Sequence, residues 1–151
     1  MNSLKSILLA EDNSMDVELT IEALARYNLA NVVEVVKDGA EAIDYLRCQG
    51  KFSSRGNGNP AVVLLDLKMP KVDGLQVLKE IKDDHHLKTI PVVVLTSSRE
   101  ESDLVKSYQL GVNAYVIKPV DFKDFVEAVS KLGVFWAIVN EPPPGSTPIS
   151  K

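Results

Sequence analysis

The sequence predicts a doubly wound α/β fold: a five-stranded parallel sheet with helices on both faces. Two observations predict it. Five short apolar runs, often rich in β-branched residues, alternate with segments whose apolar residues recur at helical spacing. Most of the runs are continuously apolar instead of alternating with polar residues, which is typical of parallel strands buried between two layers of helices. Right-handed crossovers would connect such strands.

The strands are predicted from the continuous apolar runs. The first run precedes Glu11 and Asp12, the third precedes Asp66, and the fifth precedes Lys118, so each polar group marks where a buried strand reaches solvent. Pro91 opens the fourth run. The five predicted strands are 5–10, 31–36, 61–65, 92–95 and 114–117.

The segments between the strands predict amphipathic helices. Asn13 or Ser14 would cap the first helix, Asp38 the second and Asp121 the last, because a side-chain oxygen can accept a hydrogen bond from a free N–H group of the first turn. Gly111 is predicted to end the fourth helix in the left-handed conformation. The predicted helices are 15–27, 39–46, 74–83, 100–110 and 122–132.

Size and charge limit the classes of function. The chain has 151 residues, 45% of them hydrophobic, which suits one domain with a sizeable core. A net charge of −4 argues against direct nucleic-acid binding, which needs a basic face. A single cysteine excludes an intrachain disulfide, and no apolar run reaches the roughly 20 residues that span a bilayer. We therefore expect a cytoplasmic protein that does not contact the membrane itself.

The predicted strand order brings carboxylates together. In the flavodoxin-like order 2-1-3-4-5, the first and third strands are neighbours where the winding reverses, and ligands bind there. Glu11, Asp12 and Asp66 would then converge. One such acid would be interpreted as a helix cap or a solvated loop charge, but three close carboxylates repel one another unless a cation neutralises them. An all-oxygen cluster suits Mg²⁺, and Mn²⁺ could replace it.

The order and spacing of these residues match a known family. The motifs are an acidic pair after the first strand, an aspartate and a glycine after the third, a threonine ending the fourth, and a Lys-Pro pair after the fifth: Glu11-Asp12, Asp66-Leu67-Lys68-Met69-Pro70, Gly74, Thr96 and Lys118-Pro119. Together they resemble the response-regulator receiver domain of two-component signalling, over about residues 4 to 132. The resemblance implies a phosphoryl-transfer site fed by a sensor histidine kinase.

The resemblance also implies a role for each residue. Asp66 would be the nucleophile that forms an aspartyl phosphate, while Lys118 and the Thr96 hydroxyl would contact phosphoryl oxygens. The protein would catalyse its own phosphorylation and dephosphorylation without turning over an external substrate. The implied metal ligands are Glu11, largely through water, Asp12, Asp66 and the Lys68 backbone carbonyl.

A tyrosine near the implied site predicts a conformational switch. Tyr115 lies three residues before Lys118, where receivers carry a switch aromatic. Movement of Thr96 toward a phosphoryl group would let the Tyr115 ring turn inward and reshape the surface of the fourth helix, fifth strand and fifth helix. The alternative is a half-buried strand tyrosine whose ring stays in place, and the sequence leaves both interpretations open.

Two segments go beyond the shortest receivers. Residues 50–60 are rich in glycine, serine and asparagine, which predicts a mobile surface loop. We expect a receiver domain over 1–139, with an extended last helix or short extension, and a Pro/Gly/Ser-rich tail over 140–151. Phe135 and Trp136 would either complete the core or form the interface of a homodimer.

The long loop and the Phe-Trp extension are similar to single-domain receivers paired with phytochrome-type sensor kinases. This narrower resemblance implies such a kinase as the partner, and an unknown downstream protein that reads a changed contact surface, because no output domain is expected. Two alternatives stay open. One is a receiver-like docking module that works without phosphorylation. The other, less favoured, is an aspartate-nucleophile phosphatase, in which Lys68 would stand where a second aspartate is usual.

Overall fold

Five parallel strands form one sheet in the order β2-β1-β3-β4-β5. The computed structural model describes residues 6–25, 33–55, 58–96, 101–112, 114–118 and 122–131. The strands are β1 (Ile7–Ala10), β2 (Val33–Val36), β3 (Val62–Asp66), β4 (Val92–Thr96) and β5 (Ala114–Ile117). The helices are α1 (Ser14–Ala25), α2 (Gly39–Arg47), α3 (Gly74–Asp83), α4 (Glu101–Gln109) and α5 (Phe122–Lys131), with a short 3₁₀ turn, η2 (Gly50–Phe52).

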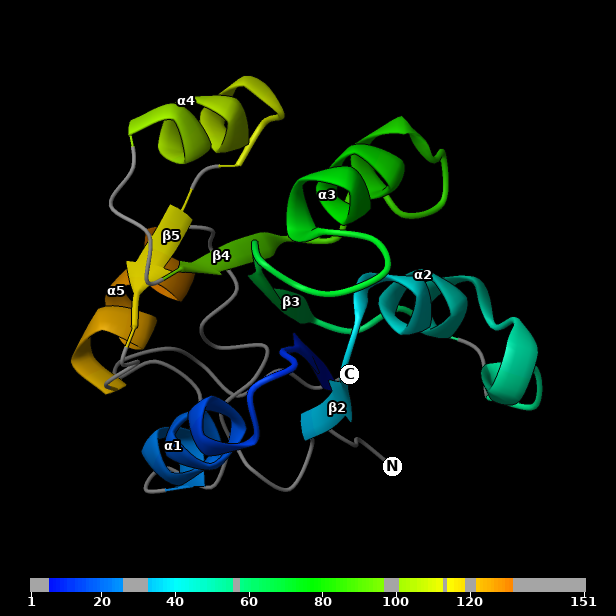
Figure 1. Ribbon diagram of the computed structural model, residues 1–151, viewed down its shortest axis with the longest axis horizontal. Coiled ribbons are helices and arrows are strands. Elements are labelled where there is room, and N and C mark those ends of the chain that lie inside the picture. Colours follow the sequence, from blue (N-terminus) through cyan, green and yellow to red (C-terminus); the bar gives the residue numbers. More distant parts are fainter. Residues whose placement is uncertain are drawn as a thin grey trace, which may run out of the picture.

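The helices form two layers. Figure 1 shows α1 and α5 on one side of the sheet and α2, α3 and α4 on the other. Alternate residues of the strands supply two separate cores: Leu8 and Leu65 face α2 and α3, whereas Leu9 and Leu64 pack with Leu24 of α1. Both faces of the central strands β1, β3 and β4 are buried, which explains their continuous apolar runs, whereas the edge strand β2 carries the exposed Glu34. The predicted fold class and strand order are confirmed.

The strand bounds differ from the predicted ones in a way that matters for the site. β3 and β4 each continue one residue further than predicted, so Asp66 and Thr96 are the last residues of their strands. Asp66 still pairs with Leu95, and Thr96 with Ile117. The predicted strands ended one residue early because they were assigned from apolar residues, whereas Asp66 and Thr96 are polar residues that continue the backbone ladder.

Most predicted helix ends are confirmed. The side-chain oxygens of Asn13 and Asp38 accept hydrogen bonds from first-turn N–H groups at 3.0 and 2.8 Å. Gly111 has a φ of 88°, and its N–H donates to the Tyr108 carbonyl oxygen at 3.0 Å. The cap of α3 was not predicted: it is Asp73, whose carboxylate accepts a hydrogen bond from the Gln76 N–H at 2.9 Å. The predicted Asp121 cap, the end of the first helix beyond Ala25, and everything after Lys131, including Phe135, Trp136 and the predicted tail, lie outside the described residues.

The described part of the 50–60 loop is anchored to α2, which its composition did not predict. The Phe52 ring meets the Tyr45 ring edge to face, with centroids 5.2 Å apart. The Arg55 guanidinium lies 4.1 Å from the Tyr45 ring centroid, and its Nε donates to the Tyr45 carbonyl oxygen at 2.9 Å. Aromatic and cation–π contacts therefore fold the loop back, whereas glycine and serine content alone predicted mobility.

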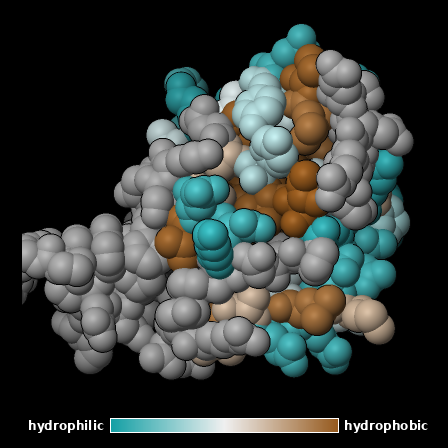
Figure 2. All heavy atoms as spheres, turned by 90° about the vertical axis from the view of Figure 1, so that its left-hand side faces the viewer, coloured by the Kyte–Doolittle hydropathy of each residue, from teal (hydrophilic) through white to brown (hydrophobic). Residues whose placement is uncertain are grey.

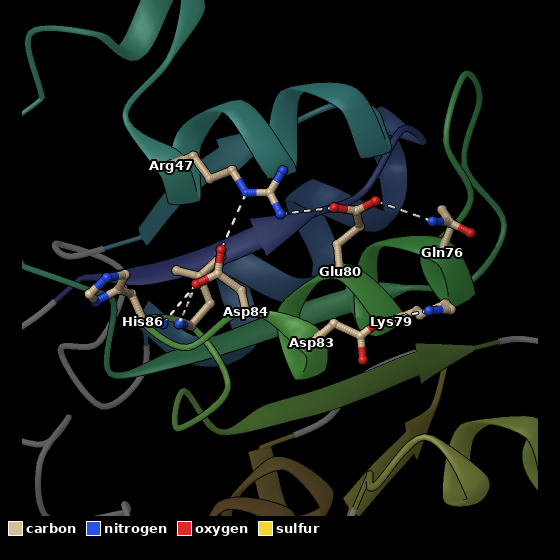
Figure 3. A network of polar contacts seen from close by, with 8 residues as sticks. Arg47, Gln76, Lys79, Glu80, Asp83, Asp84 and His86 are labelled. Carbon is tan, nitrogen blue, oxygen red and sulfur yellow. Dashed lines mark hydrogen bonds and ion pairs between the residues drawn. The ribbon is translucent and has the colours of Figure 1, made fainter.

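A polar network joins α2, α3 and the turn after α3 (Figure 3). Arg47 bridges Glu80 at 2.9 Å and Asp84 at 3.5 Å, and Asp84 accepts a hydrogen bond from the His86 N–H at 2.7 Å. These side chains are partly exposed, so solvent screens them and each pair contributes about 0–1 kcal/mol. Within the described residues, no helix is long and apolar enough to cross a membrane.

Gly74 lets α3 begin directly against the strand that ends in Asp66. Its N–H donates to the Leu67 carbonyl oxygen at 2.8 Å. A Cβ at position 74 would lie 2.2 Å from the Asp66 carbonyl oxygen and 2.6 Å from the Leu67 Cα. Both are backbone atoms that cannot rotate away, so any larger residue must displace the end of β3.

We expect Gly74→Ala to lower the free energy of unfolding by on the order of 1–3 kcal/mol, because the added methyl group overpacks a backbone contact. Urea unfolding followed by far-UV circular dichroism would measure the change. Gln76→Ala, at an exposed position of the same helix, is the control, because it introduces alanine without a new backbone contact. Equal losses in the two variants would contradict the steric argument.

Candidate functional site

Three carboxylates meet at the carboxyl end of the sheet. Glu11 follows β1, and its backbone N–H donates to the Val36 carbonyl oxygen of β2 at 2.9 Å. Glu11 is 1% exposed and Asp66 5%, whereas Asp12 is open to solvent. Carboxylate oxygens of these three residues lie within 4.8 Å of one another. The structure thus brings the predicted acids together at the point where the winding of the sheet reverses.

Lys118 is the cation of this cluster. Its side chain is 9% exposed, and its Nζ lies 2.8 Å from Glu11 Oε1 and 3.6 Å from Asp66 Oδ2. The backbone N–H of Lys118 donates to the Thr96 carbonyl oxygen at 3.0 Å, which fixes the lysine just beyond β5. The Lys118 side chain therefore points into the acidic cluster, as its implied role at the site requires.

A further acid of this cluster, Asp16, was not predicted from the sequence. Asp16 Oδ2 accepts a hydrogen bond from Lys118 Nζ at 2.9 Å. An aspartate in the first turn of a helix is readily interpreted as a favourable charge at the helix N-terminus. The position of Asp16 in the chain could have indicated its role. Because α1 starts right after the acidic pair, its first turn lies beside the same end of the sheet.

The charges of the cluster are unbalanced. Burial raises the pKa of Asp66 to about 7, the neighbouring Glu11 charge adds to the rise, and Lys118 opposes it. Burial alone would lower the pKa of Lys118, but its hydrogen bonds to Glu11 and Asp16 outweigh that effect and raise it. One lysine cannot neutralise all these carboxylates, which leaves an excess of negative charge.

The raised pKa of Asp66 predicts that the metal-free protein loses folding stability as the pH rises. Asp66 binds a proton more tightly in the folded than in the unfolded state, so its contribution to stability is full below pH 4 and is lost as the pH rises through about 7. Asp66→Asn removes this charge. In EDTA we expect the variant to be more stable than the unchanged protein at pH 8, by on the order of 1–2 kcal/mol after allowing for screening.

Melting temperatures of the two proteins between pH 5 and 8 would test this. The difference between them should shrink toward pH 5, because Asp66 is then protonated in the folded state. A constant difference across this range would show that the Asp66 charge does not titrate as expected.

Lys68 and Thr96 flank Asp66. The Lys68 N–H faces Asp66 Oδ1 at 3.4 Å, while the Lys68 side chain is exposed. Thr96 is buried at the end of the neighbouring strand, one residue beyond the partner of Asp66 in the ladder. A cavity of about 550 Å³ opens beside Asp12, lined by the β3–α3 loop that includes Lys68 and Pro70. The site is therefore reachable from solvent on the Asp12 side.

Tyr115 belongs to β5 and lies beside residues of α4 and α5. The side of the molecule that carries these elements in Figure 1 faces the viewer in Figure 2. The half-buried Tyr115 ring packs edge to face against the Tyr108 ring, with centroids 5.7 Å apart. Tyr108 is 48% exposed, and both rings line a cavity of about 400 Å³ with Asp124 and Glu127 of α5. The ring thus has space beside it, and the inward turn predicted from the sequence stays a prediction.

The donor set fits a divalent cation. All the donors are carboxylate oxygens, two of them on nearly buried residues, and they carry more negative charge than Lys118 compensates. Hard divalent ions prefer such oxygen ligands. Their charge would offset both the burial of the Asp66 carboxylate and its repulsion by Glu11, the two effects that raise the pKa of Asp66.

Residues 7–130 match the response regulator receiver domain family, and the chain belongs to that family. Among curated proteins it is 42% identical over 137 residues to the probable methanogenesis regulatory protein FilR2 of Methanothrix harundinacea, covering 91% of this chain and 86% of that protein. It is 41% identical over 135 residues to response regulator Rcp1 of Synechocystis, covering 89% of this chain and 90% of Rcp1.

Solved structures of relatives agree with this assignment. The bacteriophytochrome response regulator RtBRR is 62% identical, with a TM-score of 0.83 over 95% of this chain and 87% of that one. The phosphorylated cyanobacterial phytochrome response regulator RcpA is 43% identical, with a TM-score of 0.74 over 89% of this chain and 94% of that one. The Mn²⁺-bound form of Rcp1 is 39% identical, with a TM-score of 0.73 over 93% of this chain and 99% of that one.

Proposed function

We propose that this response regulator accepts a phosphoryl group on Asp66 from the phosphohistidine of a sensor kinase. An Asp66 oxygen attacks phosphorus, a P–O bond forms, the P–N bond breaks, and the imidazole nitrogen keeps the electron pair. The observation that carries the proposal is the convergence of Glu11, Asp12 and Asp66 within 4.8 Å, with Lys118 against two of them.

The residues around Asp66 have distinct tasks in this proposal. Lys118 donates to an oxygen of the transferred group and offsets its charge, and the Thr96 hydroxyl donates to another. Asp12, Asp66, the Lys68 carbonyl and, largely through water, Glu11 would hold Mg²⁺, which would supply positive charge beside the phosphoryl oxygens. The acidic donor set and the name of the Mn²⁺-bound relative support a divalent ion, and Mg²⁺ is our choice because carboxylates and waters suit it.

Intact-protein mass spectrometry after incubation with acetyl phosphate tests the proposal. With this donor, acetate leaves as the new P–O bond forms, so no kinase is needed. We expect one phosphoryl adduct in the presence of Mg²⁺ and none in EDTA. If neither acetyl phosphate nor a cognate kinase gives an adduct, the chain acts as a phosphorylation-independent docking module, the alternative that the sequence left open.

We also propose a phytochrome-type histidine kinase as the phosphoryl donor. The support is the name of the relatives: RtBRR, with 62% identity, is a bacteriophytochrome response regulator, and RcpA is a phytochrome response regulator. Such a kinase draws its phosphoryl group from ATP, which is why we propose a cytoplasmic location. Phosphoryl transfer from a purified phytochrome-type kinase, compared with an unrelated histidine kinase, would test the pairing.

We propose that signalling proceeds through a changed protein surface and, separately, that the chain forms a homodimer. Phe135 and Trp136 are aromatic residues of the kind that anchor interfaces, although they lie outside the described residues. We expect Phe135→Ala combined with Trp136→Ala to weaken a homodimer about tenfold or more, without loss of phosphoryl uptake. Sedimentation velocity over a concentration series measures this, and identical profiles for both proteins would contradict the interface.

A further inference from the structure

Lys118 makes its short contacts away from the residue that we propose as the phosphoryl acceptor. Its Nζ donates to Glu11 Oε1 at 2.8 Å and to Asp16 Oδ2 at 2.9 Å, whereas Asp66 Oδ2 is 3.6 Å away. The last distance is too long for a normal hydrogen bond. Two of the three ammonium N–H groups are therefore directed to Glu11, just after β1, and to Asp16 of α1, and the lysine is not fully engaged with Asp66.

The two carboxylates that accept short hydrogen bonds from Lys118 differ in how easily they can release it. Glu11 is 1% exposed, so losing Lys118 would leave a buried carboxylate without its counter-charge. The Asp16 side chain is 30% exposed in the first turn of α1, so water can replace the ammonium group there at little cost. Asp16 is the partner that can be exchanged.

A phosphoryl group on Asp66 would compete for the same ammonium group. It adds negatively charged oxygens beyond the Asp66 carboxylate, and charge-assisted hydrogen bonds to such oxygens are strong. It also places a new negative charge close to the Asp16 carboxylate, and like charges repel. Both effects favour transfer of the lysine from Asp16 to the phosphoryl group.

We propose that Asp16 is a positioning residue that holds Lys118 in the unphosphorylated protein and releases it when Asp66 is phosphorylated. The inference rests on the proposed function of Asp66. The first turn of α1 then responds directly to phosphorylation, because the ion pair between Asp16 and Lys118, which follows β5, is broken. Asp16 also slows phosphoryl uptake, since its ion pair with Lys118 must break before Lys118 can neutralise the incoming group.

Asp16→Asn keeps the shape of the side chain and removes its charge. We expect it to raise the initial rate of uptake from limiting acetyl phosphate about three- to tenfold, because Lys118 no longer has to leave a carboxylate. Glu18→Gln is the matched control, with the same change of charge on an exposed residue of the same helix, and it should leave the rate unchanged. A rate in Asp16→Asn that is unchanged or lower would overturn the proposal.

A spectroscopic measurement follows the release itself. Beryllofluoride, a mimic of the phosphoryl group, is added with Mg²⁺ to protein carrying ¹³C in its aspartate carboxyl groups. We expect the Asp16 carboxyl resonance to shift in the unchanged protein, but not with Mg²⁺ alone, and to shift much less in Lys118→Met, where only the new negative charge acts on Asp16. A purely structural Asp16 would show no such Lys118-dependent shift.

The outcomes separate this inference from the proposed function. If beryllofluoride perturbs the resonances of Asp66 and Asp12 while that of Asp16 stays in place, the site works as proposed and the release of Lys118 is wrong. If beryllofluoride does not bind and acetyl phosphate gives no adduct, the proposed function fails, and this inference fails with it.

Discussion

Asp66→Asn is expected to abolish phosphoryl uptake from acetyl phosphate and from a kinase. Asparagine keeps the size of the side chain, but its neutral amide is a poor nucleophile and a weaker metal ligand than a carboxylate. The side chain is nearly buried at the end of β3, where Asn can remain without rearranging the strand. The variant should therefore fold and, in metal-free solution at pH 8, be more stable than the unchanged protein, which separates lost chemistry from lost structure.

Intact-mass spectrometry with Mg²⁺ measures the loss, and Asp83→Asn provides the control because it removes an aspartate from an exposed ion pair with Lys79 on α3 (Figure 3). The control should take up a phosphoryl group at the normal rate. An adduct on Asp66→Asn that localises to another residue by peptide mapping would move the acceptor site away from Asp66 and contradict the proposed role.

Much of the fold could be predicted because local patterns and global topology agree. Continuous apolar strands, caps such as Asp38, and the left-handed Gly111 each depend on a few neighbouring residues. The convergence of Glu11, Asp12 and Asp66 was predictable for a different reason, since parallel strands place their carboxyl ends at one edge of the sheet and adjacent strands must share it.

What the sequence did not reveal depends on side-chain contacts between distant segments. Asp16 and Lys118 are 102 positions apart, and only their geometry shows that they form an ion pair. The anchoring of the 50–60 loop by Phe52 and Arg55 depends in the same way on the Tyr45 ring of α2. A charged or aromatic residue has several plausible partners in a sequence, and folding selects one of them.

Lys118→Met is expected to lower both the free energy of unfolding and the rate of phosphoryl uptake, each for a different reason. In metal-free protein it removes the counter-charge from the buried Glu11 and leaves Asp66 beside an unopposed carboxylate. Breaking a buried ion pair by removing one partner costs about 3–5 kcal/mol, and the partial exposure of Asp16 places this case at the lower end of that range. The methionine stem replaces much of the packing of the lysine, so the loss is mainly one of charge.

Mg²⁺ should repair the stability of Lys118→Met without repairing its chemistry. A divalent ion in the acidic cluster offsets the repulsion, so the gain in melting temperature on adding Mg²⁺ should be larger in the variant than in the unchanged protein. The hydrogen bond from Lys118 to the transferred group is still missing, so phosphoryl uptake should remain slower by on the order of a hundredfold at saturating Mg²⁺. Lys79→Met, which removes an exposed lysine, should change neither quantity appreciably. Recovery of uptake together with stability would mean that Lys118 serves only to neutralise the empty cluster, and that the metal alone provides the positive charge for transfer.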